Sequence, residues 1–379
     1  MIADERFNAA ADWVLEKYHA ELQSRRVKTF SASHFGGVFY RWNCQGRYSV
    51  PRLSILIPCL GESRQFENTL ASVLQNRPAD CEILVPHDQP YSDPYQLSGE
   101  VCFIQVPEAK SVVGLLNAGF EAARSAVVHV LQCGMEVSEG WSEAALAQFE
   151  NDNVGLVSPV LVHTKSSATI LAAGWNFTVA GRCHLSAAGS KLASLRTPAR
   201  DFLGPTLAAG YYRRSLWRLL RWDASVIDEL APLALALAAR ELGAASILEP
   251  GSVVSSEIPL IPSCNESFGY HQAATVERFF WRETNQQANW GIVALHLGLL
   301  FVETLAALPS LRAFTGLLGR IAGALKRSEA AAYHERLAEV RTRYQMQQTE
   351  REQQSTTLPF PQPRSERVEK PEKLQKRAA

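Results

Sequence analysis

Three short apolar segments, separated by segments with helical spacing, constrain the fold of this chain more than any other feature of its sequence. The apolar segments cover residues 53–57, 82–85 and 127–131, and the helical spacing runs through 66–74 and 112–123. This alternation predicts parallel strands joined by right-handed helical crossovers. Turn-forming residues follow the apolar segments at Pro58, Pro86 and Gly134, so we expect the strands to end there.

In sheets of this kind, ligands bind beyond the carboxyl ends of the strands. The loops that begin at Pro58, Pro86 and Gln132 follow the three predicted strands. We therefore expect these loops to converge and to form a ligand site.

The composition is that of a globular protein without a strong overall charge. Of the 379 residues 46% are hydrophobic, which is enough for a substantial core. Lys plus Arg and Asp plus Glu both number 38, so nucleic acid is not an expected partner. The seven cysteines are scattered without a CxxC pair, which argues for reduced thiols in the cytoplasm. The N-terminus lacks the apolar segment of a secretory signal, so we expect residence in the cytosol.

Five sequence blocks follow one another at characteristic intervals along the first half of the chain. They are residues 54–58, 70–74, 82–88, 117–119 and 131–141. In their order and spacing these blocks resemble family 2 glycosyltransferases with the GT-A fold. The resemblance implies an α/β domain with a mixed, mainly parallel sheet flanked by helices.

We expect this GT-A-type domain to span residues 49–255. An N-terminal helical extension would occupy 1–48, and a helical C-terminal region would occupy 256–354. The remaining residues, 355–379, are rich in Pro, Lys and Glu, which predicts a disordered tail.

The resemblance implies a nucleotide-sugar donor, held partly by the loops after the first two strands. In the family the first loop touches the nucleotide base, which places Pro58, Cys59 and Glu62 there. Asp88 can accept a hydrogen bond from a uracil-like N–H; its alternative role is that of a turn aspartate. Asn117 stands where the family has an Asn, with a packing or capping role as the alternative.

The family ends its third strand with an Asp-x-Asp motif that holds a divalent cation, whereas this chain has Gln132, a cysteine and Gly134. We count Gln132 and Gly134 among the nucleotide-sugar residues. Neither supplies a negative charge, so Mg or Mn is disfavoured and no cofactor is predicted. The nearby Glu136 is a weak metal candidate, because two residues of strand displace it by about 6.6 Å.

Family members also carry paired arginines and an acidic pair. Arg213 and Arg214 are the arginines that could reach the diphosphate, although adjacent strand residues point to opposite faces, so at most one should do so. The position of the acidic pair, which supplies the general base, is taken here by alanine and proline. Asp228 and Glu229, about one turn earlier, are the candidate catalytic residues; complementing a helix dipole is their alternative role.

An apolar segment at 290–308 is interrupted by His296 and Glu303, and it is therefore too short for a membrane span. We expect this segment to pack against the domain. The alternative is peripheral contact with the inner face of a membrane through 290–327, where Arg312, Arg320, Lys326 and Arg327 would face anionic headgroups.

The leading functional hypothesis is a glycosyltransferase, metal-independent if active, that uses a nucleotide sugar and a glycan or lipid-linked acceptor. Because the metal motif and the base both depart from the family pattern, a noncatalytic module that binds a nucleotide sugar, a glycan or a partner protein is the alternative. A third hypothesis is an interaction protein whose C-terminal helices carry the function.

Overall fold

The computed structural model describes residues 50–61, 64–195, 202–257, 269–285, 290–307 and 311–357. The predicted N-terminal extension and Glu62 lie outside these ranges. So does the predicted tail from residue 358 onward.

A nine-stranded sheet forms the centre of the molecule, in the order β3-β2-β1-β4-β10-β6-β11-β5, with β7 paired to β6. Its strands are β1 (Leu53–Leu56), β2 (Cys81–His87), β3 (Val101–Gln105), β4 (Val127–Leu131), β5 (Met135–Val137), β6 (Val154–His163), β7 (Ser166–Ala172), β10 (Ala209–Arg213) and β11 (Ala245–Ser256). β1, β2, β3, β4, β6 and β11 run in one direction, and β5, β7 and β10 run in the other. The expected mixed, mainly parallel sheet is thus confirmed.

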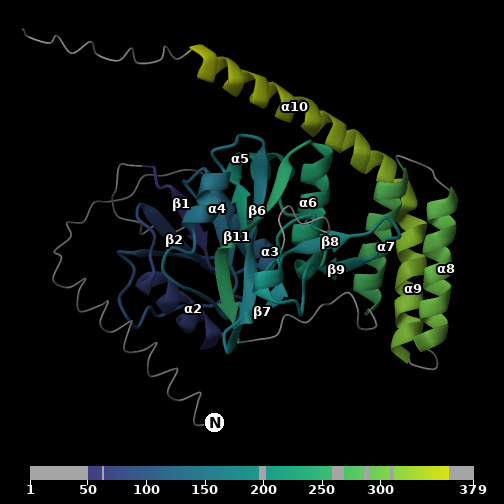
Figure 1. Ribbon diagram of the computed structural model, residues 1–379, viewed down its shortest axis with the longest axis horizontal. Coiled ribbons are helices and arrows are strands. Elements are labelled where there is room, and N and C mark those ends of the chain that lie inside the picture. The colour runs from purple at the N-terminus through teal and green to yellow at the C-terminus, as the bar shows by residue number, and fades with distance from the viewer. Residues whose placement is uncertain are drawn as a thin grey trace, which may run out of the picture.

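Helices cover both faces of this sheet (Figure 1). They are α2 (Arg64–Gln75), α3 (Val112–Ala122), α4 (Glu143–Gln148), α5 (Arg214–Leu220) and α6 (Ala231–Glu241). Leu53 and Ile55 of β1 join the core cluster that contains side chains of α2, whereas Leu56 joins the cluster that contains side chains of α3. Burial on both faces explains why three of the four residues of β1 are apolar and why all four are buried.

The predicted strands at 53–57, 82–85 and 127–131 are confirmed, but the expected end of the second strand at Pro86 is wrong. β2 continues to His87, and Pro86 is paired with Ile104 of β3. Beyond the end of β1, the carbonyl oxygen of Pro86 still accepts from the Cys59 N–H at 2.9 Å, so proline removes one donor without ending the pairing.

The expectation of reduced thiols is wrong for one cysteine. Cys59, Cys81, Cys133 and Cys183 are free. Cys102 is disulfide-bonded. The spacing of cysteines along a chain does not report which of them meet in space, so the sequence could not identify this one.

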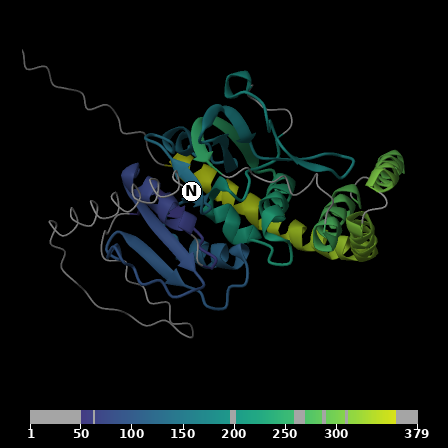
Figure 2. The same cartoon turned by 90° about the horizontal axis from the view of Figure 1, so that it is seen from below.

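The C-terminal region consists of α7 (Tyr270–Asn285), α8 (Trp290–Ala307), α9 (Leu311–Leu325) and α10 (Glu329–Thr357). The first three lie side by side, and α10 returns across the sheet domain (Figures 1 and 2). Leu337 and Tyr344 of α10 are buried in the same core cluster as residues of α5 and α6. α10 therefore belongs to the helical C-terminal region expected from the sequence, and one of its sides is buried against the sheet domain.

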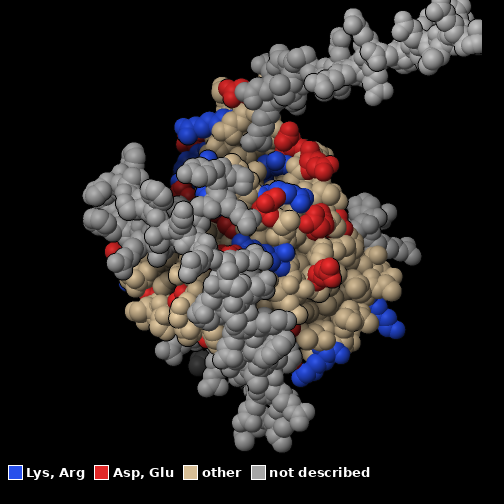
Figure 3. Space-filling model, turned by 90° about the vertical axis from the view of Figure 1, so that its left-hand side faces the viewer, with Lys and Arg blue, Asp and Glu red and all other residues tan. Residues whose placement is uncertain are grey.

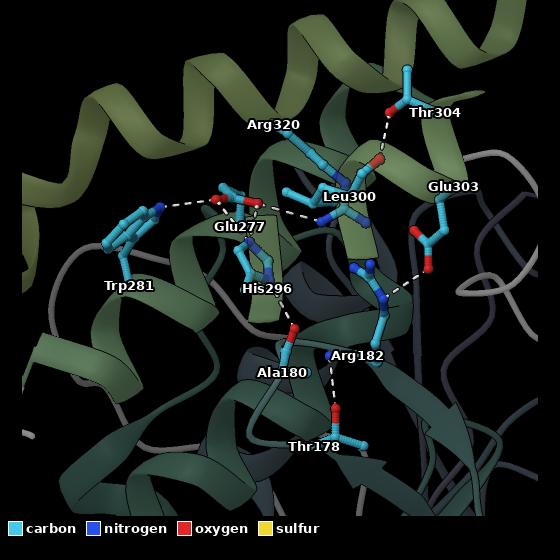
Figure 4. Close-up of polar contacts among 10 residues, drawn as sticks. All are labelled: Thr178, Ala180, Arg182, Glu277, Trp281, His296, Leu300, Glu303, Thr304 and Arg320. Atoms are coloured by element: carbon cyan, nitrogen blue, oxygen red, sulfur yellow. Dashed lines mark hydrogen bonds and ion pairs between the residues drawn. The ribbon is translucent and has the colours of Figure 1, made fainter. Parts of the chain in front are cut away.

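A buried polar network joins three of these helices (Figure 4). The carboxylate of Glu277 on α7 accepts hydrogen bonds from His296 Nε2 (3.2 Å), Arg320 Nη1 (3.3 Å) and Trp281 Nε1 (2.9 Å). On α8, Glu303 forms an ion pair with Arg182 at 2.9 Å. Both titratable side chains of α8 thus pair with side chains from other segments of the chain.

In the described parts of the chain, no helix is both long enough and apolar enough to cross a membrane.

Candidate functional site

The loops after β1, β2 and β4 meet at the carboxyl edge of the sheet. The Cys59 N–H donates to the carbonyl oxygen of Pro86 at 2.9 Å, and the Gly61 N–H donates to Asp88 Oδ1 at 2.7 Å. Cys133 Sγ donates to the carbonyl oxygen of Pro58 at 3.3 Å. The structure therefore brings together the predicted residues Pro58, Cys59 and Asp88 with the loop that begins at Gln132.

Asp88 is half-buried and keeps part of its carboxylate open. Oδ1 accepts from Gly61 and Oδ2 from the Gln89 side chain at 3.0 Å. Its slight burial acts in the opposite direction, but these hydrogen bonds hold the pKa of Asp88 below its ordinary value. A carboxylate has about four lone-pair sites, so ionised Asp88 can accept a further N–H.

An aromatic cluster lies beside Asp88. The ring of Tyr91 is stacked on Phe103 with centroids 4.8 Å apart, and Phe66 meets it edge-on at 5.5 Å. The Tyr91 hydroxyl is buried without a hydrogen-bond partner among the described residues. From the sequence, Tyr91 was predicted only to lie in the loop after the second strand.

The loop after β4 is fixed mainly by its backbone. The Gln132 N–H donates to the carbonyl oxygen of Ala208 at 2.9 Å, and the Gly134 N–H donates to Thr69 Oγ1 at 2.8 Å. Gly134 has a φ of +92°, a conformation that glycine adopts readily and that explains this residue at the turn.

The donor groups of this loop do not fit a hard divalent cation. Gln132 and Gly134 bring no carboxylate, and Glu136 lies on β5, opposite Ser255 of β11. Burial, and then the charge of Glu257, raise the pKa of Glu136. Within the described ranges no three His, Cys, Asp or Glu side chains are grouped so that they could hold a metal ion.

Arg213 and Arg214 lie at the other edge of the sheet. Because β10 runs antiparallel to β4, Arg213 is opposite Val127, the first residue of β4. Its buried guanidinium donates to the carbonyl oxygens of Val154, Phe149 and Asn151 at 2.7, 2.9 and 2.8 Å. Arg214 follows it at the start of α5. The structure does not bring either arginine to the loops at the carboxyl edge.

Asn117 contacts the backbone of the chain rather than the loops. Its amide nitrogen donates to the Trp222 carbonyl oxygen at 3.4 Å, and its amide oxygen accepts from the Trp222 N–H at 3.3 Å. This arrangement corresponds to the packing role that the sequence left as an alternative.

The two candidate catalytic carboxylates differ in what they bind. Asp228 accepts from the N–H groups of Val112 and Val113, at 2.7 and 3.1 Å, and so caps the start of α3 together with Ser111. The neighbouring Glu229 is exposed, and no described residue forms a hydrogen bond or ion pair with it. Of the two, Glu229 is the carboxylate free to take a proton.

Two buried polar groups near the start of β10 were not predicted. The backbone of Trp175 pairs with Gly204, and the chain then passes Thr206 before β10 begins at the carboxyl edge. Trp175 Nε1 and Thr206 Oγ1 are buried without a hydrogen-bond partner in the described part of the chain. Such groups are candidates for contact with a bound ligand. The Gly-Pro turn before the strand was the only sequence signal nearby.

The face shown in Figure 3 has no large patch of a single charge among its described residues. On the described part of this face, basic and acidic side chains are interspersed. On this face, a broad electrostatic field is therefore not expected to guide a ligand.

Residues 54–220 match the sequence model described as "Glycosyl transferase family 2". The chain is 28% identical over 129 residues to a human protein described as "Probable polypeptide N-acetylgalactosaminyltransferase 8", a match that covers 29% of this chain and 20% of that protein. The match thus spans a minor part of that relative's length.

Two solved structures show a weak overall likeness. One is GalNAc-T7 with UDP, GalNAc and Mn2+ (TM-score 0.46, 14% identity, 64% of this chain and 52% of that one). The other is the mannosyltransferase PcManGT from Pyrobaculum calidifontis in complex with GDP-Man and Mn2+ (TM-score 0.43, 15% identity, 88% of this chain and 94% of that one).

Proposed function

We propose that this protein transfers a sugar from a nucleotide sugar to a glycan or lipid-linked acceptor, because residues 54–220 match the model of glycosyl transferase family 2, as the order of their sequence blocks suggested. The observation that carries the proposal is the convergence of the loops after β1, β2 and β4 within this matched region. The Asp88 carboxylate, which can accept a further hydrogen bond, lies where these loops meet.

In this proposal the carboxyl edge holds the donor. Asp88 accepts an N–H of the nucleotide base, while Pro58, Cys59, Gln132 and Gly134 line the rest of the donor pocket. Exposed Glu229, on the short 3-10 helix η2 (Asp228–Leu230), removes the proton of the acceptor hydroxyl. The acceptor oxygen then attacks the anomeric carbon, and the nucleoside diphosphate leaves with the bonding electrons.

The loop after β4 supports a metal-independent form of this reaction, because its donor groups do not suit Mg or Mn. In the proposed site the charge of the leaving diphosphate is met by hydrogen bonds rather than by a cation. Titration calorimetry with a panel of nucleoside diphosphate sugars, with and without Mn, tests donor binding and the need for a metal together.

Asp88→Ala is expected to weaken binding of the nucleotide sugar by about tenfold to a hundredfold, since a hydrogen bond to a charged group contributes about 1.5–3 kcal/mol. The matched control is Asp93→Ala in the same loop, because Asp93 accepts only from the nearby N–H groups of Leu97 and Ser98. Equal affinities of the wild type and Asp88→Ala in the same calorimetric titration would remove Asp88 from the site.

The alternative function, a noncatalytic module, is favoured by one observation. Asp228 is committed to capping α3, so only one of the two candidate bases is open. Tight binding of a nucleotide sugar, without transfer to any acceptor tested, is the result that would select this alternative.

We also propose peripheral membrane contact through the exposed apolar side chains of α8 and α9, which we call the α8–α9 surface. It contains Leu295, Leu297, Leu299, Phe301, Val302 and Leu305 of α8, and Phe314, Leu317, Leu318, Ile321 and Leu325 of α9. Of the two titratable side chains of α8, His296 is buried against Glu277, and Glu303, whose side chain is 54% exposed, is paired with Arg182. The exposed side chains of the α8–α9 surface are apolar, as a lipid environment requires.

Of the basic residues expected to face headgroups, Arg320 is instead buried against Glu277, so that assignment is wrong. Lys326 is exposed at the end of α9. The side chains of Arg312 and Arg327 lie outside the described part of the structure.

Phe301→Ser is expected to lower binding to phosphatidylcholine vesicles by about tenfold, since burial of a large apolar side chain contributes about 1.5–3 kcal/mol. Phe301 is 65% exposed, so the substitution should leave the fold unchanged. Val179→Ser, at a 72% exposed residue outside the α8–α9 surface, serves as the control. Vesicle flotation measures the effect, and equal flotation of the two variants would contradict membrane contact.

A further inference from the structure

A cavity of about 760 Å³ lies between the loop that follows α5 and the helices α7 and α10. Its volume is in the range of small-molecule sites. None of the residues assigned to the carboxyl-edge site lines it. The cavity exists because α10 returns across the sheet domain and covers the loop at residues 221–225.

Basic side chains predominate in the walls of this cavity. Its lining contains five basic residues, Arg221, Arg278, Arg282, Lys326 and Arg336, and two acidic ones, Asp223 and Glu329. Arg221 is paired with Glu121, and Lys326 with Glu329 at 3.8 Å. The Asp223 carboxylate accepts from the N–H and the hydroxyl of Ser225.

Three arginines remain without a carboxylate partner among the described residues: Arg278, Arg282 and Arg336. Their positions are fixed by neutral groups. Arg278 donates to Thr275 Oγ1 at 3.2 Å and to the Ser225 carbonyl oxygen at 3.4 Å. The guanidinium of Arg282 lies 4.3 Å from the centroid of the Tyr333 ring. Asp223 is the one lining carboxylate without a basic partner among the described residues, so these three arginines leave the cavity positively charged on balance.

We propose that this cavity binds a phosphate-bearing ligand. Guanidinium groups form charge-assisted, often bidentate hydrogen bonds with phosphate oxygens. A phosphate or diphosphate carries negative charge that complements the excess of positive charge in the lining. The apolar part of the lining, which includes Trp222 and Leu337, can accommodate the rest of the molecule. The site is separate from the donor pocket and goes beyond the proposed transfer reaction.

Two sources can present this group. One is a soluble phosphorylated compound that enters the cavity from water. The other is a phospholipid headgroup, because Lys326 in the cavity wall directly follows Leu325 of the α8–α9 surface. The chemistry at the arginines is the same for both sources.

The test uses the full chain and inorganic pyrophosphate as the probe, with calorimetry as the measurement. Arg336→Gln, at an exposed position, and the double variant Arg278→Gln/Arg282→Gln should each bind pyrophosphate at least about tenfold more weakly than wild type. Arg343→Gln, also exposed on α10 but outside the lining, should bind as wild type does. If the double variant does not fold, Arg336→Gln alone decides the result.

A parallel measurement identifies the source. Vesicles of phosphatidylcholine, with and without phosphatidic acid, are tested for flotation of the same variants. Binding that requires phosphatidic acid and is weakened by Arg336→Gln supports the proposal with a lipid headgroup as the source. The proposal is overturned if wild type binds neither probe, or if Arg336→Gln binds both as wild type does. Because pyrophosphate binding is measured without donor turnover, failure of the transferase proposal would not affect this result.

Discussion

Glu229→Gln is expected to lower kcat for sugar transfer by about a hundredfold to ten-thousandfold, the usual contribution of a general base. Glutamine keeps the size of the side chain but cannot take the proton of the acceptor hydroxyl. Since Glu229 is exposed and forms no hydrogen bond or ion pair with other described residues, the melting temperature should not change. Initial rates at saturating donor and acceptor are the measurement.

The neighbouring Asp228 provides the matched control. Asp228→Ala removes the acceptor for two N–H groups of α3, and it should lower the free energy of unfolding by about 1–2 kcal/mol. In the proposed mechanism the folded variant keeps most of its turnover. Loss of turnover in Asp228→Ala, with wild-type turnover in Glu229→Gln, would exchange the roles of the two carboxylates.

Glu277→Ala is expected to lower the free energy of unfolding by about 3–5 kcal/mol, because it removes the carboxylate that pairs with the buried charge of Arg320. The carboxylate of Glu277 is shared by Arg320, His296 and Trp281, which come from three helices (Figure 4). Urea denaturation followed by circular dichroism measures the change. Glu335→Ala, at an exposed position of α10, should shift the midpoint only slightly.

A double-mutant cycle separates the ion pair from simple loss of packing. If the buried charges are coupled, Glu277→Leu combined with Arg320→Leu should be destabilised by less than the sum of the two single variants. Strict additivity of the two effects would show that the network holds the helices together only through contact area.

The strands and the converging loops could be predicted because local patterns determine them. The strands β1, β2 and β4 are buried on both faces, so each is mostly apolar and is followed by a turn. Parallel alternation then places their carboxyl ends at one edge. The positions of Pro58, Asp88 and Gln132 follow from that geometry.

The positions of the arginines could not be predicted, because they depend on strand direction. Arg213 would lie at the carboxyl edge if β10 ran parallel to β4; the antiparallel pairing places it at the opposite edge. No local pattern in residues 209–213 determines this direction. The same limit applies to Asp228, which caps a helix more than a hundred residues away in the sequence.

Contacts between segments that are distant in the sequence could likewise not be predicted. The hairpin of β8 (Trp175–Phe177) and β9 (Cys183–Leu185) was not predicted from the sequence. The sequence of α10 predicts a helix, but its buried Leu337 and Tyr344 are too few to indicate which surface it covers. The cavity beneath α10 depends on that placement.

The most direct test of the account is a crystal structure of the protein soaked with the nucleoside diphosphate sugar that binds best in calorimetry. We expect electron density for the nucleotide at the carboxyl edge, with the base within hydrogen-bond distance of Asp88 and the diphosphate beside the loop at 132–134. Density for the nucleotide at any other place, with this edge empty, would contradict it.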